Sequence, residues 1–178
     1  MELTYLKQPP KRYTFEQPKL KRWVEQNCNG LVLNLFAGKT RLLVKKEIRV
    51  DIDKSVNPDY CMDAMSFINY WKDNNKQKFN TVVLDPPYNL RKGREKYNGR
   101  YIGCFTKIKK ELVDIIADDG IVITLGYSTA GIGLKSFKKE KLCVICHSGD
   151  HNDTLCLLER KVVKNLLEYN KKIDYEKT

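Results

Sequence analysis

A carboxylate, two prolines and an aromatic residue follow one another at Asp85-Pro86-Pro87-Tyr88. The carboxylate and the proline carbonyls can accept hydrogen bonds, whereas a proline has no N–H and holds its φ near about −65°. The tyrosine ring offers a flat face on which another ring can stack. These residues suit a planar ligand that carries an amino group, with both amino hydrogens accepted. The alternative is an ordinary turn that ends a strand, because Asp-Pro is common in turns.

The element that positions this turn is the apolar, β-branched run from Phe79 to Leu84. Its pattern predicts a buried parallel strand, which the prolines end. Open α/β sheets bind their ligands at the carboxyl ends of their strands. We therefore expect Asp85 to lie in a ligand site at the carboxyl end of a central strand.

The Asp-Pro-Pro-Tyr turn resembles the motif of the S-adenosylmethionine-dependent amino-methyltransferases that act on nucleic acid bases. The resemblance implies that the catalytic residues are Asp85, Pro86, Pro87 and Tyr88. An Asp at the first position, rather than Ser, favours adenine N6 over cytosine N4 in that family. The chemistry is suitable, since Asp85 and a backbone carbonyl can accept the two amino hydrogens and stabilise positive charge that develops on nitrogen.

A glycine turn earlier in the chain resembles the first cofactor motif of the same family. The strand predicted at Leu31 to Leu35 leads into Phe36-Ala37-Gly38, where a glycine lets the backbone approach the ligand. The sequence departs from the family at Thr40, where a second glycine is usual. A full helix is also missing after this turn, because only Lys39 to Lys46 precede the next strand. The five or six residues that follow that strand are too few for a helical crossover, so we expect a pared-down sheet edge on the cofactor side.

Two acids further along resemble the remaining cofactor contacts. The strand predicted at Ile48 to Asp53 carries Asp51, whose counterpart in the family binds both ribose hydroxyls. Asp53 could take that role instead, because both side chains lie on one face of the strand. Asp63 resembles the acid that accepts the adenine amino group, and it could equally cap a helix from Ala64 to Lys72.

The resemblance implies S-adenosylmethionine as the cofactor. A segment before the first helix, predicted at Lys19 to Gln26, weakly resembles the aromatic and proline segment that flanks the cofactor in the family. The implied cofactor-binding residues are Phe15, Gln17, Pro18, Asn34, Phe36, Ala37, Gly38, Asp51, Ile52, Asp63 and Ala64.

Charge favours a polyanionic partner. The chain has 33 Lys and Arg against 22 Asp and Glu, a net charge of +11. A basic stretch with interleaved tyrosines follows the Asp-Pro-Pro-Tyr turn, and it suits phosphate contacts and base stacking. The alternative is a solvated loop. The candidate nucleic-acid-binding residues are Arg91, Lys92, Arg94, Lys96, Tyr97, Arg100 and Tyr101.

Patterning along the whole chain predicts one α/β domain over residues 1–178. The resemblance implies a Rossmann-like methyltransferase fold with a mostly parallel sheet and an antiparallel edge hairpin. That hairpin is formed by Leu142 to His147 and Thr154 to Glu159. The remaining segments are expected to be an N-terminal arm at 1–12, helices at Phe105 to Ala117 and Gly131 to Lys138, and a helical tail at 161–178.

The cysteines and the apolar runs exclude other classes. Cys143 and Cys146 precede His147 in a haem-attachment spacing, but residues three apart on a strand point to opposite faces, so we predict no metal site. No apolar run approaches the roughly 20 residues of a membrane span, and the N-terminus lacks an apolar signal region, so a cytoplasmic protein is expected.

The function that the resemblance implies is methyl transfer to an exocyclic amino group, with adenine N6 in DNA as the leading substrate. An RNA base amino group, adenine N6 or guanine N2, is the alternative. A non-catalytic nucleic-acid-binding subunit is another, motivated by Thr40 and the short crossovers. No segment is long enough for a target-recognition domain, so a partner subunit could supply recognition. The target sequence, oligomeric state and biological role stay open.

Overall fold

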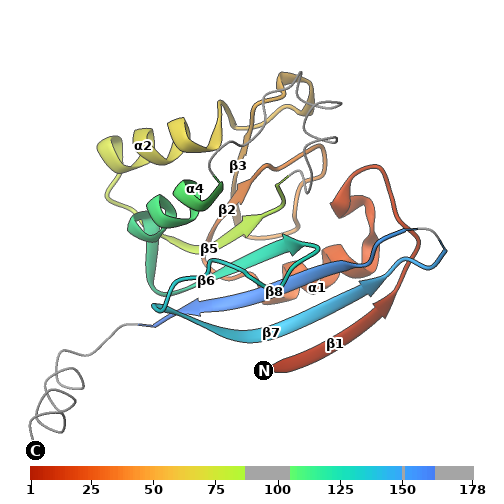
Figure 1. Cartoon of the computed structure of the whole chain (residues 1–178). Helices are drawn as coiled ribbons and strands as arrows, with labels where there is room; N and C mark the ends of the chain where they lie inside the picture. Colours follow the sequence, from red (N-terminus) through yellow and green to blue (C-terminus); the bar gives the residue numbers. More distant parts are fainter. Residues whose placement is uncertain (87–104, 150, 163–178) are drawn as a thin grey trace, which may run out of the picture.

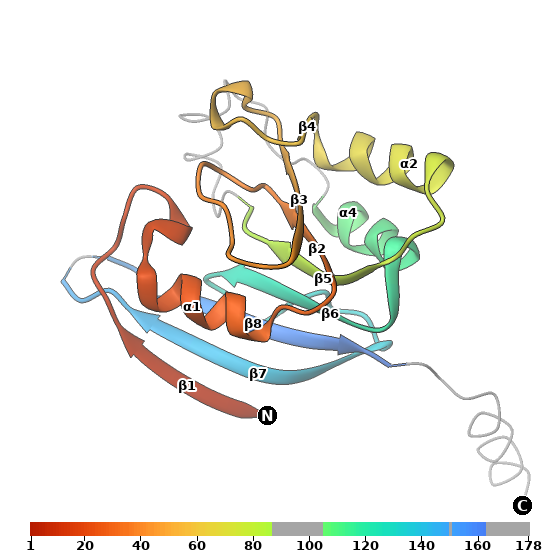
Figure 2. The ribbon, with the colours of Figure 1, turned by 180° about the vertical axis from the view of Figure 1, so that it is seen from behind.

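The computed structural model describes residues 1–86, 105–149 and 151–162. Its described strands form one sheet in the order β1-β7-β8-β6-β5-β2-β3-β4 (Figures 1 and 2). The neighbours pair in parallel except at β8, which runs antiparallel to both β6 and β7. The predicted fold is confirmed: a mostly parallel Rossmann-like sheet with an antiparallel pair toward one edge and few helices.

The bounds of the elements are as follows. The strands are β1 Glu2–Lys7, β2 Leu31–Leu35, β3 Lys46–Asp51, β4 Tyr60–Cys61, β5 Phe79–Leu84, β6 Ile116–Gly126, β7 Phe137–Cys146 and β8 Thr154–Lys161. The α-helices are α1 Pro18–Asn27, α2 Ala64–Asn74 and α4 Phe105–Leu112, and the 3₁₀ helices are η1 Thr14–Glu16, η2 Lys54–Val56 and η3 Val113–Ile115.

Helices cover both faces of the sheet, with α1 on one side and α2 and α4 on the other (Figures 1 and 2). Alternate residues of the central strands therefore enter two cores. In β5, Val83 packs on the α1 side, whereas Val82 and Leu84 pack on the α2 side. β2 is buried along its whole length, as expected for a strand that is covered on both faces, and its one polar residue, Asn34, is buried as well.

The two crossovers that join β2 to β3 and β3 to β4 contain no α-helix, as predicted. Residues 36–45 join β2 to β3 irregularly, and η2 is the only helical turn between β3 and β4. Side chains hold the first loop in place of a helix. Leu42 is buried in the α1-side core, its N–H donates to Glu47, and the Leu43 N–H donates to Glu25 of α1 at 2.6 Å.

The N-terminal arm predicted at residues 1–12 is wrong for its first half. Residues Glu2–Lys7 form β1, which pairs in parallel with β7 from Glu2 opposite Lys141 to Lys7 opposite Cys146. Its Leu6 side chain packs against the α1-side core. Pairing with the open backbone edge of β7 decides this conformation, and the local sequence does not show that such a partner is available.

Two predicted helices are also corrected. The helix predicted at Phe105 to Ala117 ends as an α-helix at Leu112, and β6 begins at Ile116. The pairing of β5 with β6 slips by several residues after Phe79, so the stretch before Ile121 bulges out of the ladder, with Asp119 at φ 62°. No helix forms at 131–138, because turns lead directly into β7.

The remaining boundaries differ by small amounts. The second strand ends at Asp51 rather than Asp53, and β7 begins five residues earlier than predicted. Residues 163–178 of the predicted tail lie outside the described residues. In the part of the chain that the structure describes, no helix is long and apolar enough to span a membrane.

Candidate active site

A cavity of about 370 Å³ opens where the carboxyl ends of the parallel strands meet. Its walls come from the segments that follow β2, β3, β5 and β6, from the stretch before α1, and from the hairpin between β7 and β8. This is the edge at which open α/β sheets bind ligands. Of the described candidate residues, the cavity wall includes Phe15, Gln17, Phe36, Ala37, Gly38, Asp51, Asp85 and Pro86.

Asp85 enters the cavity directly after the central strand β5. Leu84 pairs with Leu35 of β2 and with Thr124 of β6, so the strand that delivers the carboxylate is flanked on both sides. The Asp85 N–H continues toward the Leu35 carbonyl at 3.5 Å, and Pro86 is buried. The backbone that carries the carboxylate is therefore held in place at the cavity wall. Pro87, Tyr88 and the basic residues 91–101 lie outside the described residues.

The glycine turn after β2 is tied to the end of β3. Gly38 has φ 56°, a conformation that favours glycine, and its N–H donates to Asp51 Oδ2 at 2.9 Å. The other Asp51 oxygen accepts the Asp53 N–H at 2.9 Å. Each carboxylate oxygen keeps a further lone pair, so buried Asp51 can still accept hydrogen bonds from a ligand.

Asp53 also lines the cavity, so both acids weighed for the ribose role lie at its wall. The Asp53 side chain caps η2 by accepting the Ser55 N–H at 2.8 Å. Asp53 is more exposed than Asp51, and its carboxylate belongs to a surface turn. Asp51 is the better-fixed acceptor of the two.

Asp63 acts as the N-cap of α2. Its carboxylate accepts the N–H groups of Met65 and Ser66, each at 3.0 Å, and the Ser66 hydroxyl. Burial by itself would raise the pKa of Asp63, but these hydrogen bonds outweigh it and lower the pKa. Asp63 is absent from the described wall of the cavity, so its second role, as an adenine contact, stays a prediction.

Four more predicted cofactor residues are absent from the described cavity wall: Pro18, Asn34, Ile52 and Ala64. Pro18 occupies the first turn of α1, and Ala64 begins α2. Asn34 is buried, and its amide donates to Glu47 at 2.9 Å. Their roles in cofactor binding stay predictions.

Sequence reasoning missed a polar cluster that joins the two ends of the chain at the cavity. The Gln8 side chain donates to Gln17 at 3.1 Å, and His147 Nδ1 lies 2.9 Å from the Gln8 carbonyl. A carbonyl only accepts, so His147 carries its proton on Nδ1. His147 Nε2 then accepts the Thr154 hydroxyl at 2.9 Å.

The sequence could have predicted that His147 and Thr154 lie close together. The predicted hairpin already placed His147 at the end of one strand and Thr154 at the start of the next, where antiparallel partners lie side by side. These contacts also account for the histidine of the Cys143–His147 stretch. The described residues contain no group of three or more His, Cys, Asp or Glu side chains arranged to hold a metal ion. Burial raises the pKa of Cys143 to about 12, which favours an inert thiol.

Positive charge surrounds the opening. Lys11, Arg12 and Lys39 line the cavity, and the Arg12 guanidinium lies 5.7 Å from the centre of the Tyr13 ring. Such a rim attracts anionic ligands. The described cavity thus combines a carboxylate on a central strand, a glycine turn anchored to a buried acid, and a basic rim.

No family model matches the sequence, and no curated protein is similar to it. Solved structures do match in fold. SMU.776 in complex with S-adenosylhomocysteine (SAH) has a TM-score of 0.66 at 12% identity over 83% of this chain. This chain spans 50% of the length of that protein.

Two further structures match at lower similarity. The N-methyltransferase NodS from Bradyrhizobium japonicum has a TM-score of 0.53 at 11% identity, covering 75% of this chain and 86% of its own. An rRNA methylase from Streptococcus thermophilus has a TM-score of 0.54 at 10% identity, covering 86% of this chain and 100% of its own. The chain has the methyltransferase fold. At these identities the likeness is one of fold alone.

Proposed function

We propose that this protein is an S-adenosylmethionine-dependent methyltransferase that modifies an exocyclic amino group of a nucleic acid base. One observation carries the proposal. Asp85 and buried Pro86, at the end of the central strand, line the same cavity as the Gly38 turn and Asp51. The first pair has the chemistry to hold an amino group, and the second pair has the chemistry to hold a nucleoside cofactor.

The cofactor would supply a methyl group on a positively charged sulfur. Gly38, which has no side chain to block a ligand, and Asp51, with its spare acceptor capacity, are the residues proposed to hold it, together with Phe15 and Gln17 from the segment before α1. Fixed acceptors suit the ribose hydroxyls, because a diol can donate two hydrogen bonds to one carboxylate. The solved structure with SAH that shares this fold supports the choice of cofactor.

Asp85 is proposed to orient the base. An exocyclic amino nitrogen is a poor nucleophile because its lone pair is conjugated with the ring. If Asp85 and the Pro86 carbonyl accept its two hydrogens, the lone pair turns toward the methyl group and the charge that develops on nitrogen is stabilised. Alignment of the two reactants supplies much of the remaining rate gain. Tyr88 is proposed to stack on the base.

Adenine N6 in DNA is the leading substrate, because the motif begins with Asp. A base in a duplex must first be flipped out, which costs a few kcal/mol, and stacking on Tyr88 would offset part of that cost. The basic cavity rim and residues 91–101 are proposed to bind phosphates, and a partner subunit could add sequence recognition. An RNA base amino group is the second candidate, favoured by the shared fold with an rRNA methylase.

The test uses the purified protein, methyl-labelled cofactor, and DNA and RNA substrates in parallel. Digestion to nucleosides and mass spectrometry then identify the methylated base. We expect N6-methyladenosine in its deoxy form, whereas methylated ribonucleosides would select the RNA alternative. Calorimetric titration with SAH tests the cofactor separately. Failure to bind SAH, with and without oligonucleotide, would leave only the non-catalytic nucleic-acid-binding subunit.

Asp85→Ala separates catalysis from binding. Removing a group that stabilises transition-state charge typically costs about 10² to 10³ in rate. We expect that loss in transfer, with SAH affinity within about threefold of wild type because Asp85 is not a proposed cofactor ligand. The matched control is Asp73→Ala, an acid on α2 outside the described cavity wall, which should leave both quantities unchanged. Transfer that survives in Asp85→Ala would contradict the catalytic role.

A further inference from the structure

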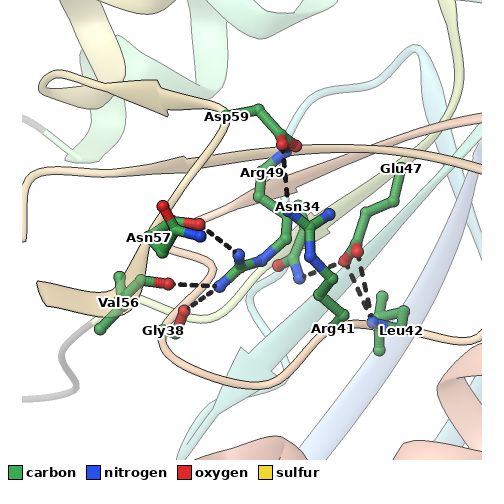
Figure 3. Close-up of polar contacts among 9 residues, drawn as sticks. All are labelled: Asn34, Gly38, Arg41, Leu42, Glu47, Arg49, Val56, Asn57 and Asp59. Carbon is green, nitrogen blue, oxygen red and sulfur yellow. Dashed lines mark hydrogen bonds and ion pairs between the residues drawn. The ribbon is translucent and has the colours of Figure 1, made fainter. Parts of the chain in front are cut away.

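One buried cation lies behind the cavity wall. Arg49 belongs to β3 and is 2% exposed. Its guanidinium binds backbone carbonyls: Nη1 donates to Asn57 at 2.7 Å, and Nη2 donates to Gly38 and to Val56 (Figure 3). Arg49 Nε is buried and has no hydrogen-bond partner among the described residues. The hydrogen-bond acceptors of the guanidinium are all neutral carbonyls, although the Glu47 carboxylate also attracts it electrostatically. Burying a charge costs free energy, so the position calls for an explanation.

The acceptors belong to the two loops that take the place of helical crossovers. Gly38 lies between β2 and β3, whereas Val56 and Asn57 lie between β3 and β4. Gly38 and Val56 both line the cavity, but Arg49 is absent from its described wall. One side chain therefore joins the backbones of two separate segments of the wall, from behind.

Gly38 is held on both of its backbone polar groups. Asp51 accepts its N–H at 2.9 Å, and Arg49 donates to its carbonyl. Arg49 and Asp51 are two residues apart on one strand, so both side chains leave the same face. The strand thus fixes the orientation of the glycine turn with one anion and one cation.

The backbone of Arg49 also holds the second loop. Its N–H donates to Asp59 Oδ2 at 2.8 Å, and its carbonyl accepts the Asp59 N–H at 3.0 Å. Asn57, whose carbonyl binds the guanidinium, is itself left-handed at φ 50°. The loop at residues 53–59 is therefore held by hydrogen bonds to Arg49, and it contains no α-helix.

The energetic reason is preorganisation. A loop that must be ordered when a ligand binds loses conformational entropy at that moment, and this lowers the affinity. A planar guanidinium with five N–H donors can hold several carbonyls in fixed geometry, which a lysine cannot do. A loop without helical or strand hydrogen bonds has greater need of such a fixed partner.

We infer that Arg49 is the positioning residue of the cofactor wall. It holds the backbones of Gly38 and Val56 in the conformation that binds the ligand. In this way it orders the two loops that have no crossover helix. The inference rests on the proposed function for the identity of the ligand. It predicts a loss of cofactor affinity from a residue that does not touch the cofactor.

The test compares Arg49→Met and Arg49→Lys with wild type by calorimetric titration with SAH, well below each melting temperature. Losing hydrogen bonds made by a charged group should raise the dissociation constant about tenfold to a hundredfold in Arg49→Met. Arg49→Lys keeps the charge and should fall between. The matched control is Arg160→Met on β8, whose guanidinium also binds a backbone carbonyl, that of Asp119, away from the cavity. Its dissociation constant should equal that of wild type.

The binding stoichiometry in the SAH titration distinguishes a positioning role of Arg49 from a role in stability alone. Partial unfolding lowers the fraction of protein that binds without weakening the folded fraction. A wild-type dissociation constant with reduced stoichiometry in both Arg49 variants would therefore overturn the inference. If Arg49→Met does not fold, Arg49→Lys decides by the same criterion, because it preserves the charge and most of the volume.

Amide hydrogen exchange in the free protein tests the role of Arg49 without SAH, and so applies even if wild type does not bind SAH. The Gly38 and Val56 amides should exchange about tenfold faster in the Arg49 variants, while the Leu33 amide in β2 keeps its protection. Unchanged exchange at Gly38 and Val56 would overturn the role of Arg49. Faster exchange without SAH binding in wild type would instead reject the proposed cofactor.

Discussion

The two edges of the sheet are stabilised in different ways. At the β1-β7-β8 edge, long strands pair over many residues, and Cys143, Ile145, Cys156 and Leu158 pack against α1. At the β2-β3-β4 edge, the last strand has only two residues, and the loops are held by Asp51, Glu47 and Arg49. Both edges have ladder hydrogen bonds and apolar burial, but the loops of the second edge also depend on a few polar side chains.

This difference has a functional consequence. Apolar packing tolerates changes that preserve volume and resists opening, but it offers no donors or acceptors to a ligand. Charged side chains that bind loop backbones are costly to bury, but they can hold in place loops that line a cavity and have no helix of their own. We therefore expect the β2-β3-β4 edge, the proposed cofactor edge, to contribute less to stability and more to ligand binding than the β1-β7-β8 edge, and the predictions below test that contrast.

The largest effect on stability is expected at the apolar edge. Leu158 is 2% exposed in β8, between β6 and β7. Leu158→Ala should lower the free energy of unfolding by about 2–5 kcal/mol through lost burial and a cavity. Urea denaturation measures this change, and SAH affinity of the folded protein should stay constant. Leu3→Ala, at an exposed position on the same edge, is the control and should change stability by less than about 0.5 kcal/mol.

An intermediate effect is expected where the cofactor edge meets α2. Asp63→Ala removes the N-cap and should cost about 0.5–2 kcal/mol in unfolding free energy, whereas Asp63→Asn keeps a capping side chain and should cost less. SAH titration of the two variants tests the predicted adenine contact. If Asp63→Ala binds SAH as tightly as wild type does, Asp63 is a cap alone.

The same residue gives a pH dependence with a defined sign. The folded-state pKa of Asp63 lies below its ordinary value of 3.8, so the ionised form stabilises the folded protein. That contribution is fully present above the ordinary pKa and is lost as the pH falls through the lower folded-state pKa. The stability difference between wild type and Asp63→Asn, measured by urea denaturation, should therefore shrink as the pH is lowered below about 4. A difference that grows on acidification would contradict this linkage.

The smallest effect is expected at the outer surface of the cofactor edge. Arg41 forms an ion pair with Asp59 at 3.2 Å, and the two side chains are 55% and 35% exposed. Exposed pairs contribute about 0.2–1 kcal/mol, so Arg41→Ala should lie within that range and leave SAH affinity unchanged. Comparing the SAH affinities of Arg41→Ala and Arg49→Met distinguishes the effect of the exposed arginine from that of the buried one. A large loss of affinity in Arg41→Ala would shift the positioning role to the surface pair.

The sequence by itself determined the features that depend on local pattern. Three features follow from apolar runs, proline and glycine chemistry, and side-chain capping, each set within a few residues. They are the strand that leads into Asp85, the glycine turn after β2 and the capping acid before α2. The parallel order of these strands then placed Asp85 and Gly38 at one edge, because carboxyl ends of parallel strands coincide. The strand-to-strand spacing also predicted the absence of crossover helices.

Only the tertiary structure decided the features that depend on distant partners. Glu2–Lys7 becomes a strand because β7 offers an open edge, and His147 has its tautomer set by Gln8, 139 residues earlier in the chain. Ile116 begins a strand because β5 lies beside it, although its sequence continues a helical pattern. The role of Arg49 was hidden for the same reason. A charged residue within a strand carries no local signal of burial, and its acceptors come together only when both loops close around it.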